Sequence, residues 1–203
     1  MTERALCAVI TLFAISSSAC RGGGGPRASA ARADVGSAPT PPTPPAPRAQ
    51  DTSFGGTTAP VHRARALRPG VPPGMLRAVE SPAGGAGYDR VVFQFTGDSV
   101  PGYSVEYATA PVQRCGSGDP VSVAGAGRLV VRFEPARAHD EQGHVAPLER
   151  DRALGLPTVK QLKLVCDFEG QVEWVLGVAT AAPFRVSELT GPARLVLDVK
   201  HAP

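Results

Sequence analysis

The sequence of 203 residues lacks a hydrophobic run long enough to span a membrane, since its longest run, residues 5–15, holds about eleven residues. It also lacks the metalloprotease motif His-Glu-x-x-His, the esterase motif Gly-x-Ser-x-Gly, a phosphate-binding loop and a dinucleotide-binding fingerprint. These absences exclude a membrane-spanning helix and the enzymes that such motifs mark. The 21 Pro and 23 Gly exclude a long helical bundle, and 42% hydrophobic residues exclude a wholly disordered chain.

The N-terminus is typical of a bacterial export signal. The apolar run is followed by small residues and then by Cys20. Small residues just before a cysteine resemble the lipobox, whose cysteine thiol is acylated and becomes the new N-terminus. We therefore expect residues 1–20 to be a lipoprotein signal peptide, with Cys20 as a lipid anchor that holds an exported protein at a membrane of the cell envelope. The alternative is a plain secretory signal cut nearby, which leaves the protein exported as well.

Residues 21–73 are predicted to form a disordered tether rich in Pro, Gly and Arg. Residues 21–70 contain nine Pro and eight Gly, a composition that favours extended polyproline II and flexible coil. The same stretch has seven Arg against two Asp, whereas residues 71–203 have thirteen basic and fifteen acidic residues. Because the basic excess belongs to the tether, the folded part is not expected to bind nucleic acid.

Residues 74–203 are predicted to fold as an all-β domain, an antiparallel β-sandwich. Apolar residues alternate with polar ones in short runs separated by Gly-rich turns, which favours sheets with one buried face. The only tryptophan, Trp174, lies in such a run and is expected in the core. About nine strands are expected, in residues 76–80, 88–96, 103–107, 121–124, 129–133, 162–166, 172–178, 184–189 and 195–199. Residues 136–157 are predicted to be a long loop with room for a helical turn.

Two cysteines remain after the signal peptide and the lipid anchor are set aside. Cys115 and Cys166 form an even pair in an oxidising compartment, which suggests a disulfide that closes a loop of about 50 residues. Because Cys166 lies on the apolar face of its predicted strand, a buried free thiol is the alternative.

Two patterns suggest enzymatic or metal chemistry. Ser99 in a Gly-Asp-Ser turn, with Asp198 and His201 near the end of the chain, resembles the first and last blocks of GDSL or SGNH esterases, which implies a nucleophile, an orienting acid and a base. That family continues into a helix after the serine, whereas Pro-Gly follows here. Residues 139–144 hold two His, but their spacing matches no zinc or calcium motif, so no metal and no cofactor is expected.

The surface candidates for ligand binding are tyrosines and arginines of the predicted strands. Sugar rings stack on exposed aromatic faces, and arginine guanidiniums bind the carboxylates of peptide stems. Ordinary solvated strand faces are the alternative for each of these residues. The candidates are Tyr88, Arg90, Tyr103, Arg185 and Arg194.

A series of motifs in residues 74–201 resembles the AMIN-like domain of bacterial lipoproteins. The motifs are GYDRVVF at 87–93, PGY at 101–103, HD at 139–140, DFEG at 167–170, WVLG at 174–177, PFRV at 183–186 and PARLVLDV at 192–199. The resemblance implies a β-sandwich related to AMIN domains, which target cell-wall amidases by binding peptidoglycan and also occur in secretins. It supplies no catalytic residues.

These observations together predict a non-enzymatic envelope lipoprotein whose domain binds peptidoglycan or another cell-wall polymer. One alternative is a scaffold that recruits an envelope protein partner through an edge strand. A further alternative is the esterase described above.

Overall fold

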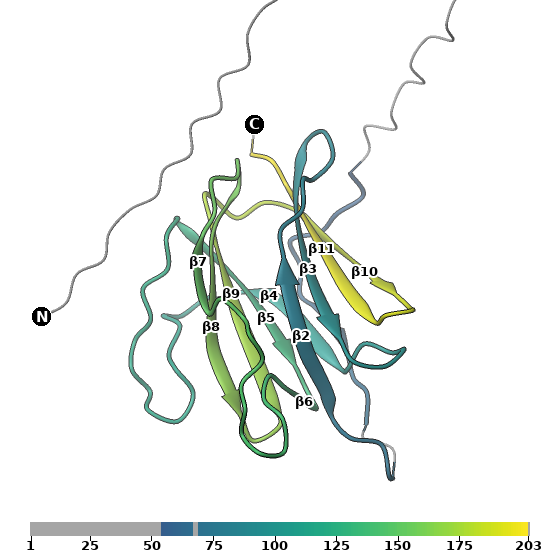
Figure 1. The fold of residues 1–203 in the computed structure, drawn as a ribbon. Coiled ribbons are helices and arrows are strands. Elements are labelled where there is room, and N and C mark those ends of the chain that lie inside the picture. Colours follow the sequence, from purple (N-terminus) through teal and green to yellow (C-terminus); the bar gives the residue numbers. More distant parts are fainter. Residues whose placement is uncertain (1–53, 67–68, 203) are drawn as a thin grey trace, which may run out of the picture. The chain divides into compact units, whose positions relative to one another are not determined.

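The computed structural model describes residues 54–66 and 69–202, and these residues form two β-sheets packed face to face (Figure 1). The described residues contain no helix, and therefore none that could cross a membrane. The prediction of an all-β sandwich is confirmed. The predicted signal peptide and Cys20 lie outside the described residues. The strands are β1 Val61–Arg63, β2 Gly74–Glu80, β3 Tyr88–Phe95, β4 Tyr103–Tyr107, β5 Gly127–Phe133, β6 Ala136–Arg137, β7 Asp151–Ala153, β8 Val159–Phe168, β9 Gln171–Val178, β10 Phe184–Leu189 and β11 Arg194–Lys200.

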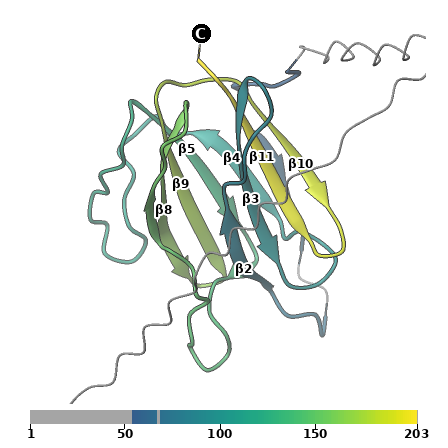
Figure 2. The same cartoon turned by 45° about the horizontal axis from the view of Figure 1, so that its top comes forward.

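The two sheets have different sizes and nearly uniform pairing. One contains six strands in the order β1-β4-β5-β9-β8-β7, and the other contains five in the order β10-β11-β3-β2-β6. Figure 2 shows β2, β3, β11 and β10 as one layer and β8, β9, β5 and β4 as the other. All strand pairs are antiparallel except the parallel pair of β2 and β6. Three of the four edge strands, β1, β6 and β7, have only two or three residues each, whereas the fourth, β10, has six.

The core lies between the sheets and is built on aromatic rings. Trp174 is 0% exposed, which confirms its predicted place in the core. Its ring centroid lies 6.3 Å from that of Phe93, and Phe93 lies 5.1 Å from Phe133. Because Phe93 belongs to the five-stranded sheet and the other two rings to the six-stranded sheet, these contacts join the two layers.

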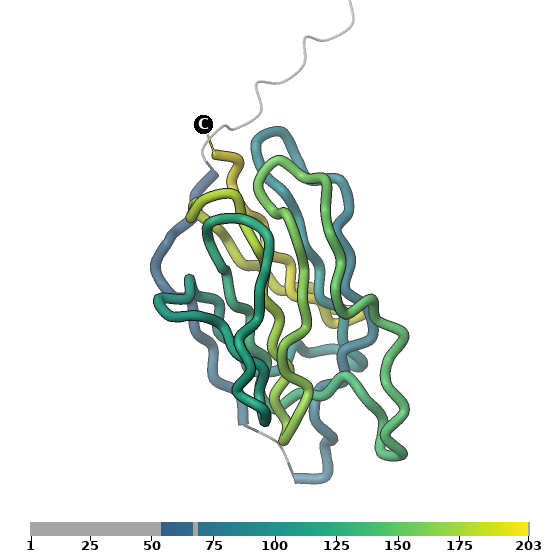
Figure 3. Tube along the Cα trace, turned by 90° about the vertical axis from the view of Figure 1, so that its left-hand side faces the viewer, coloured from purple at the N-terminus to yellow at the C-terminus, as the bar shows by residue number. Residues whose placement is uncertain are grey.

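A second, smaller hydrophobic cluster lies on the outer face of the six-stranded sheet. The connection between β4 and β5 packs Val112 and Val123 against β8 and β9, and Figure 3 shows this connection facing the viewer. Glycine at position 177 permits the close approach, because a Cβ there would collide with the carbonyl oxygen of Ala124. A disulfide between Cys115 and Cys166 joins the same connection to β8. As a result β9 is buried on both faces, whereas β3 alternates between half-buried and buried residues.

The structure differs from the predicted strands in two regions. Residues 136–157 hold β6 and β7 and no helical turn, and residues 121–124 form no strand. Both new strands are short and polar, so alternation does not reveal them. Their pairing is set by neighbours far away in sequence, since β6 lies beside β2 and β7 beside β8.

The ordered fold also begins earlier than the predicted boundary at residue 74. Thr57 exchanges two backbone hydrogen bonds of 2.8 Å with Phe184 of β10. Four residues later the chain enters β1, which pairs with β4. Residues 54–66 therefore belong to the sandwich, and the prediction of a tether through residue 73 is wrong for them. A three-residue strand after a Pro- and Gly-rich stretch has too little alternation to be recognised.

At one end of the sandwich, a buried carboxylate joins the two sheets. Asp89 is 3% exposed, and its Oδ2 accepts hydrogen bonds from the amides of Thr158 (2.7 Å) and Val159 (2.8 Å) in the other sheet. Its Oδ1 lies 2.8 Å from Nε2 of His201. This interaction ties the C-terminus to both layers.

Candidate functional site

Three adjacent strands place opposite charges in a row on the outer face of the five-stranded sheet. Asp198 of β11 lies directly opposite Arg90 of β3 on one side and Arg185 of β10 on the other. Its neighbours Leu197 and Val199 point into the core and are 0% exposed. Because side chains alternate along a strand, Asp198 and the two arginines face outward.

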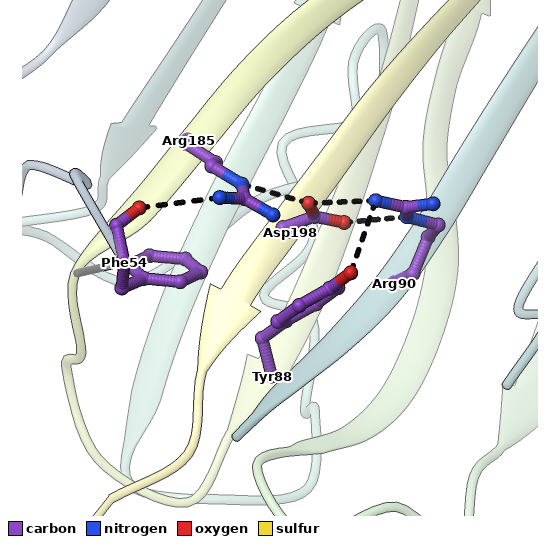
Figure 4. Close-up of polar contacts among 5 residues, drawn as sticks. All are labelled: Phe54, Tyr88, Arg90, Arg185 and Asp198. Carbon is purple, nitrogen blue, oxygen red and sulfur yellow. Dashed lines mark hydrogen bonds and ion pairs between the residues drawn. The ribbon is translucent and has the colours of Figure 1, made fainter. Parts of the chain in front are cut away.

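The two guanidiniums share the single carboxylate of Asp198 (Figure 4). Arg90 donates from Nε to Oδ1 at 2.7 Å and from Nη2 to Oδ2 at 2.9 Å, a bidentate pair. Arg185 donates from Nε to Oδ2 at 2.9 Å. The hydrogen bond to Asp198 raises the pKa of Arg90. The Asp198 side chain is 3% exposed, while those of Arg90 and Arg185 are 34% and 39% exposed. The row therefore presents one positive charge in excess to solvent.

Two aromatic rings complete the arrangement. The guanidinium carbon of Arg185 lies 4.9 Å from the ring centroids of both Phe54 and Tyr88, and that of Arg90 lies 5.4 Å from the Tyr88 ring. Arg185 also donates to the carbonyl oxygen of Phe54 at 3.4 Å, and Arg90 to Oη of Tyr88 at 3.4 Å. These five residues, Phe54, Tyr88, Arg90, Arg185 and Asp198, are called the arginine–aromatic cluster below.

The arginine–aromatic cluster is suited to binding a ligand that combines an anionic group with a planar or ring-shaped apolar surface. Each guanidinium has five N–H donors, and the contacts described above use only some of them. Since both arginines are more than one third exposed, their remaining donors are available to a carboxylate from solvent. The half-buried rings of Phe54 and Tyr88 offer apolar surface beside them.

Three of the predicted ligand-binding residues come together in this cluster. Tyr88 and Arg90 lie on β3 and Arg185 lies on β10, the two strands that flank β11, and the Tyr88 ring contacts both guanidiniums. Arg194 does not join them, because it begins β11 at the opposite end of the sheet from Asp198. Four residues of extended chain separate the two by about 13 Å.

Tyr103 does not lie on the surface, so that part of the prediction is wrong. It is 6% exposed within the core, and its hydroxyl donates to Oε1 of Glu188 at 3.1 Å. Burial raises the pKa of this hydroxyl. The strand's alternation does not say which of its faces points inward, and β4 turns its tyrosines toward the other sheet.

Phe54 and Asp198 belong to the cluster but were not predicted as binding residues. Phe54 lies in the segment that composition assigns to the tether, and no sequence signal connects it to Arg185, which is 131 positions away. The sequence does mark Asp198 as unusual, because it is a lone acidic residue on the polar face of an otherwise apolar strand. Only the register of β11 with β3 and β10 shows that this acid meets two arginines.

The residues of the esterase alternative do not form a catalytic triad. Asp198 is bound by two arginines, and His201 contacts Asp89. Ser99 is exposed in the loop after the end of β3, whereas His201 lies beside the beginning of β3, because β11 runs antiparallel to it. A serine and a base at opposite ends of a strand cannot exchange a proton. The structure therefore contradicts this alternative.

The histidines of residues 139–144 engage two different carboxylates. Nδ1 of His139 lies 2.9 Å from Asp167, and Nδ1 of His144 lies 3.0 Å from Asp140. Desolvation acts to raise the pKa of Asp140, but the hydrogen bonds from His144 outweigh it and lower that pKa. Within residues 54–66 and 69–202, no three His, Cys, Asp or Glu residues gather in a way that suits a metal ion.

Comparison with protein families gives one match. The family model described as the AMIN-like domain matches residues 82–201, which include β3 to β11 and every residue of the arginine–aromatic cluster except Phe54. No curated protein and no solved structure matches the chain.

Proposed function

The chain belongs to the AMIN-like domain family, and on that premise we propose that its β-sandwich binds peptidoglycan through the arginine–aromatic cluster. AMIN-like domains are non-catalytic domains of exported cell-envelope proteins and are associated with peptidoglycan. The proposal goes further in naming the surface. In the proposed arrangement, Cys20 carries a lipid and residues 21–53 connect that anchor to the wall-binding domain.

The observation that carries this proposal is the convergence of Arg90, Arg185 and Tyr88 around one buried acid. Asp198 holds both guanidiniums in fixed positions, so little side-chain entropy is lost when they bind a ligand. Peptidoglycan offers both partners that such a surface requires: carboxylates on its peptide stems, and sugar rings with apolar faces. We therefore assign the peptide carboxylate to the guanidiniums and the apolar ring face to Tyr88.

The direct test is co-sedimentation of the full-length chain with intact peptidoglycan sacculi. Arg185→Ala is the informative variant, because Arg90 keeps its bidentate contact with Asp198 and the fold is retained. Loss of one charge-assisted hydrogen bond to the ligand is expected to weaken binding about tenfold. Arg77→Ala is the matched control, since Arg77 is exposed on β2 and its side chain forms a hydrogen bond to Sδ of Met75 at 3.7 Å and no ion pair with any described residue.

A chemical variant of the polymer tests the assigned ligand group. Sacculi whose carboxylates have been converted to amides are expected to bind about tenfold more weakly, because the neutral amide loses the charge-assisted bond. Equal binding of both polymers, or of Arg185→Ala and the parent, would show that the arginine–aromatic cluster is not the wall-binding surface.

An edge strand favours a second candidate function, the recruitment of an envelope protein. Both backbone groups of Phe184 point away from β11, toward Thr57. By alternation, the backbone groups of Val186 and Glu188 face the same open edge, and no described residue pairs with them there. A chain that fails to sediment with sacculi and whose Val186 and Glu188 amides become protected from exchange by an envelope protein would favour this function.

A further inference from the structure

A small polar pocket lies where the connection between β4 and β5 meets β8. Its volume is about 320 Å³, near the lower end of the range of about 300–1,000 Å³ that small ligands occupy in proteins. The connection contributes Arg114, the start of β7 contributes Arg150 and Asp151, and β8 contributes residues 163–167. These residues belong to the six-stranded sheet and its connections, so the pocket is separate from the arginine–aromatic cluster on the other sheet.

The backbone of β8 positions both arginines of this pocket. The pairing of β8 with β9 is irregular at Val165, which has no partner in β9. The carbonyl oxygen of Val165 instead accepts a hydrogen bond of 3.3 Å from the amide of Cys115, whose disulfide to β8 fixes the connection at this point. The amide of Leu164 donates to the carbonyl oxygen of Arg150 at 2.8 Å. Because Arg114 directly precedes Cys115, the two arginines are held beside consecutive residues of one strand.

The two carboxylates of the lining already have partners within the protein. One oxygen of Asp151 accepts a hydrogen bond from the side-chain amide of Gln161, and the other lies 2.8 Å from Nζ of Lys163. The side chain of Asp167 is 8% exposed, lies 2.9 Å from Nδ1 of His139 and accepts a backbone N–H at 2.9 Å. Both negative charges are thus directed to donors of the protein itself.

The cationic groups of the lining retain free donors. Arg114 is exposed, and its side chain forms no hydrogen bond or ion pair within the described part of the chain. The side chain of Arg150 is 43% exposed and reaches Asp167 only at 3.6 Å, which is too far for a hydrogen bond. The ammonium of Lys163 has three donors, of which a carboxylate and a backbone carbonyl use two. Three cationic groups therefore have donors available for a ligand.

The lining is unsuited to a ligand that depends on apolar contact. Among the described residues that form the pocket there is no aromatic side chain, so a sugar ring would find no stacking surface. Its apolar residues Leu164 and Val165 are only 6% and 4% exposed. A compact anion with several oxygens fits better, because guanidiniums bind phosphate oxygens through two parallel N–H donors.

We propose that this pocket binds the phosphate group of a small phosphate ester. Arg114 and Arg150 donate to the phosphate oxygens, and Lys163 supplies its third donor. A phosphate monoester has three oxygens that accept such bonds, one for each cationic group, whereas a carboxylate has two. The site does not depend on the wall-binding proposal, because it lies on the other sheet and uses none of the residues of the arginine–aromatic cluster.

The test titrates three anions into the isotopically labelled full-length chain at constant ionic strength: glycerol 3-phosphate, inorganic phosphate and acetate. Both phosphates are expected to shift the backbone amide resonances of Cys115 and Leu164 saturably, and to bind at least about fivefold more tightly than acetate. Equal binding of acetate, or shifts confined to other residues, would overturn the proposal. Binding of inorganic phosphate without glycerol 3-phosphate would also overturn it, because the pocket would then admit the free ion and no ester.

A variant of the unpaired arginine locates the charge. Arg114→Gln is expected to weaken binding of glycerol 3-phosphate about fivefold, and the fold is retained because no described residue depends on this side chain. Arg77→Gln is the matched control, since Arg77 is exposed on β2 in the other sheet. Unchanged affinity in Arg114→Gln would overturn the assignment. Because neither experiment uses sacculi or Arg185, the outcome is separate from that of the wall-binding test.

Discussion

Replacing Asp198 by Asn removes the charge that two guanidiniums share while it keeps the size of the side chain. In the parent protein, the carboxylate of Asp198 accepts three charge-assisted hydrogen bonds, of 2.7, 2.9 and 2.9 Å. Asparagine keeps one acceptor oxygen and turns its NH₂ donor toward a guanidinium that has no acceptor. The variant therefore loses charge attraction and leaves donors facing each other at a position that is 3% exposed.

The expected loss follows from the burial of each partner. A hydrogen bond to a charged group contributes about 1.5–3 kcal/mol, and removal of one partner from a fully buried pair costs about 3–5 kcal/mol. Here the side chains of Arg90 and Arg185 are 34% and 39% exposed, so water replaces part of what they lose. We expect Asp198→Asn to lower the free energy of unfolding by about 2 kcal/mol. For a domain of about 150 residues that lowers the Tm by about 4–8 °C.

The fluorescence of Trp174 allows the unfolding of these variants to be followed directly. It is the only tryptophan in the chain, and it is 0% exposed in the core, so its fluorescence reports global unfolding. Urea titrations of the full-length chain give the free energy of unfolding from the midpoint and slope. Arg185→Gln is expected to lose only about 1 kcal/mol, because the bidentate contact of Arg90 remains.

The matched control is Asp98→Asn, since Asp98 is exposed in the turn after β3. Its free energy of unfolding is expected to stay within about 0.5 kcal/mol of the parent. If Asp198→Asn also stays within that margin with an unchanged slope, the reasoning that Asp198 organises the arginine–aromatic cluster is refuted.

Three further predictions concern other parts of the sandwich. Removing the disulfide by replacing Cys115 and Cys166 with Ser should lower the free energy of unfolding by about 4 kcal/mol in urea, because the bond constrains a sequence separation of 51 residues in the unfolded chain; no difference from the parent would contradict this. Gly102→Ala should abolish protection of the β1 amides from hydrogen exchange, because its Cβ collides with backbone, whereas Gly155→Ala meets no atom within 4 Å and should leave protection unchanged. The hydrogen bond from Lys163, the opposite residue of β8, lowers the pKa of Asp151, and a second hydrogen bond from Gln161 adds to this effect. The stabilisation is therefore complete above about pH 4 and is lost as the pH falls through the lowered pKa. Asp151→Asn should cost about 0.5 kcal/mol at pH 7 and less at pH 2, and equal losses at both would refute the assignment.

The edges of the fold were the least predictable part. The long strands are recognisable by alternation, as in β3, where every second residue is buried. The strands β1, β6 and β7 have two or three residues and polar sequences, so they form only because a longer strand offers unpaired backbone beside them. The same reason explains why composition places residues 54–66 in the tether. A truncated chain that retains the whole domain must therefore begin before Phe54, because a later start removes one ring of the arginine–aromatic cluster and then β1.

The amino-acid sequence by itself determined the all-β class, the core position of Trp174 and the membership of the AMIN-like family, because each depends on local alternation or on motifs in order along the chain. The tertiary structure alone decided which polar residues meet. Arg90 and Asp198 are 108 positions apart, and Arg185 and Phe54 are 131 apart, so their contact depends on the register of three strands and on the path of the N-terminal segment. Register is a property of pairs of strands, and a one-residue shift would turn Asp198 from the surface into the core.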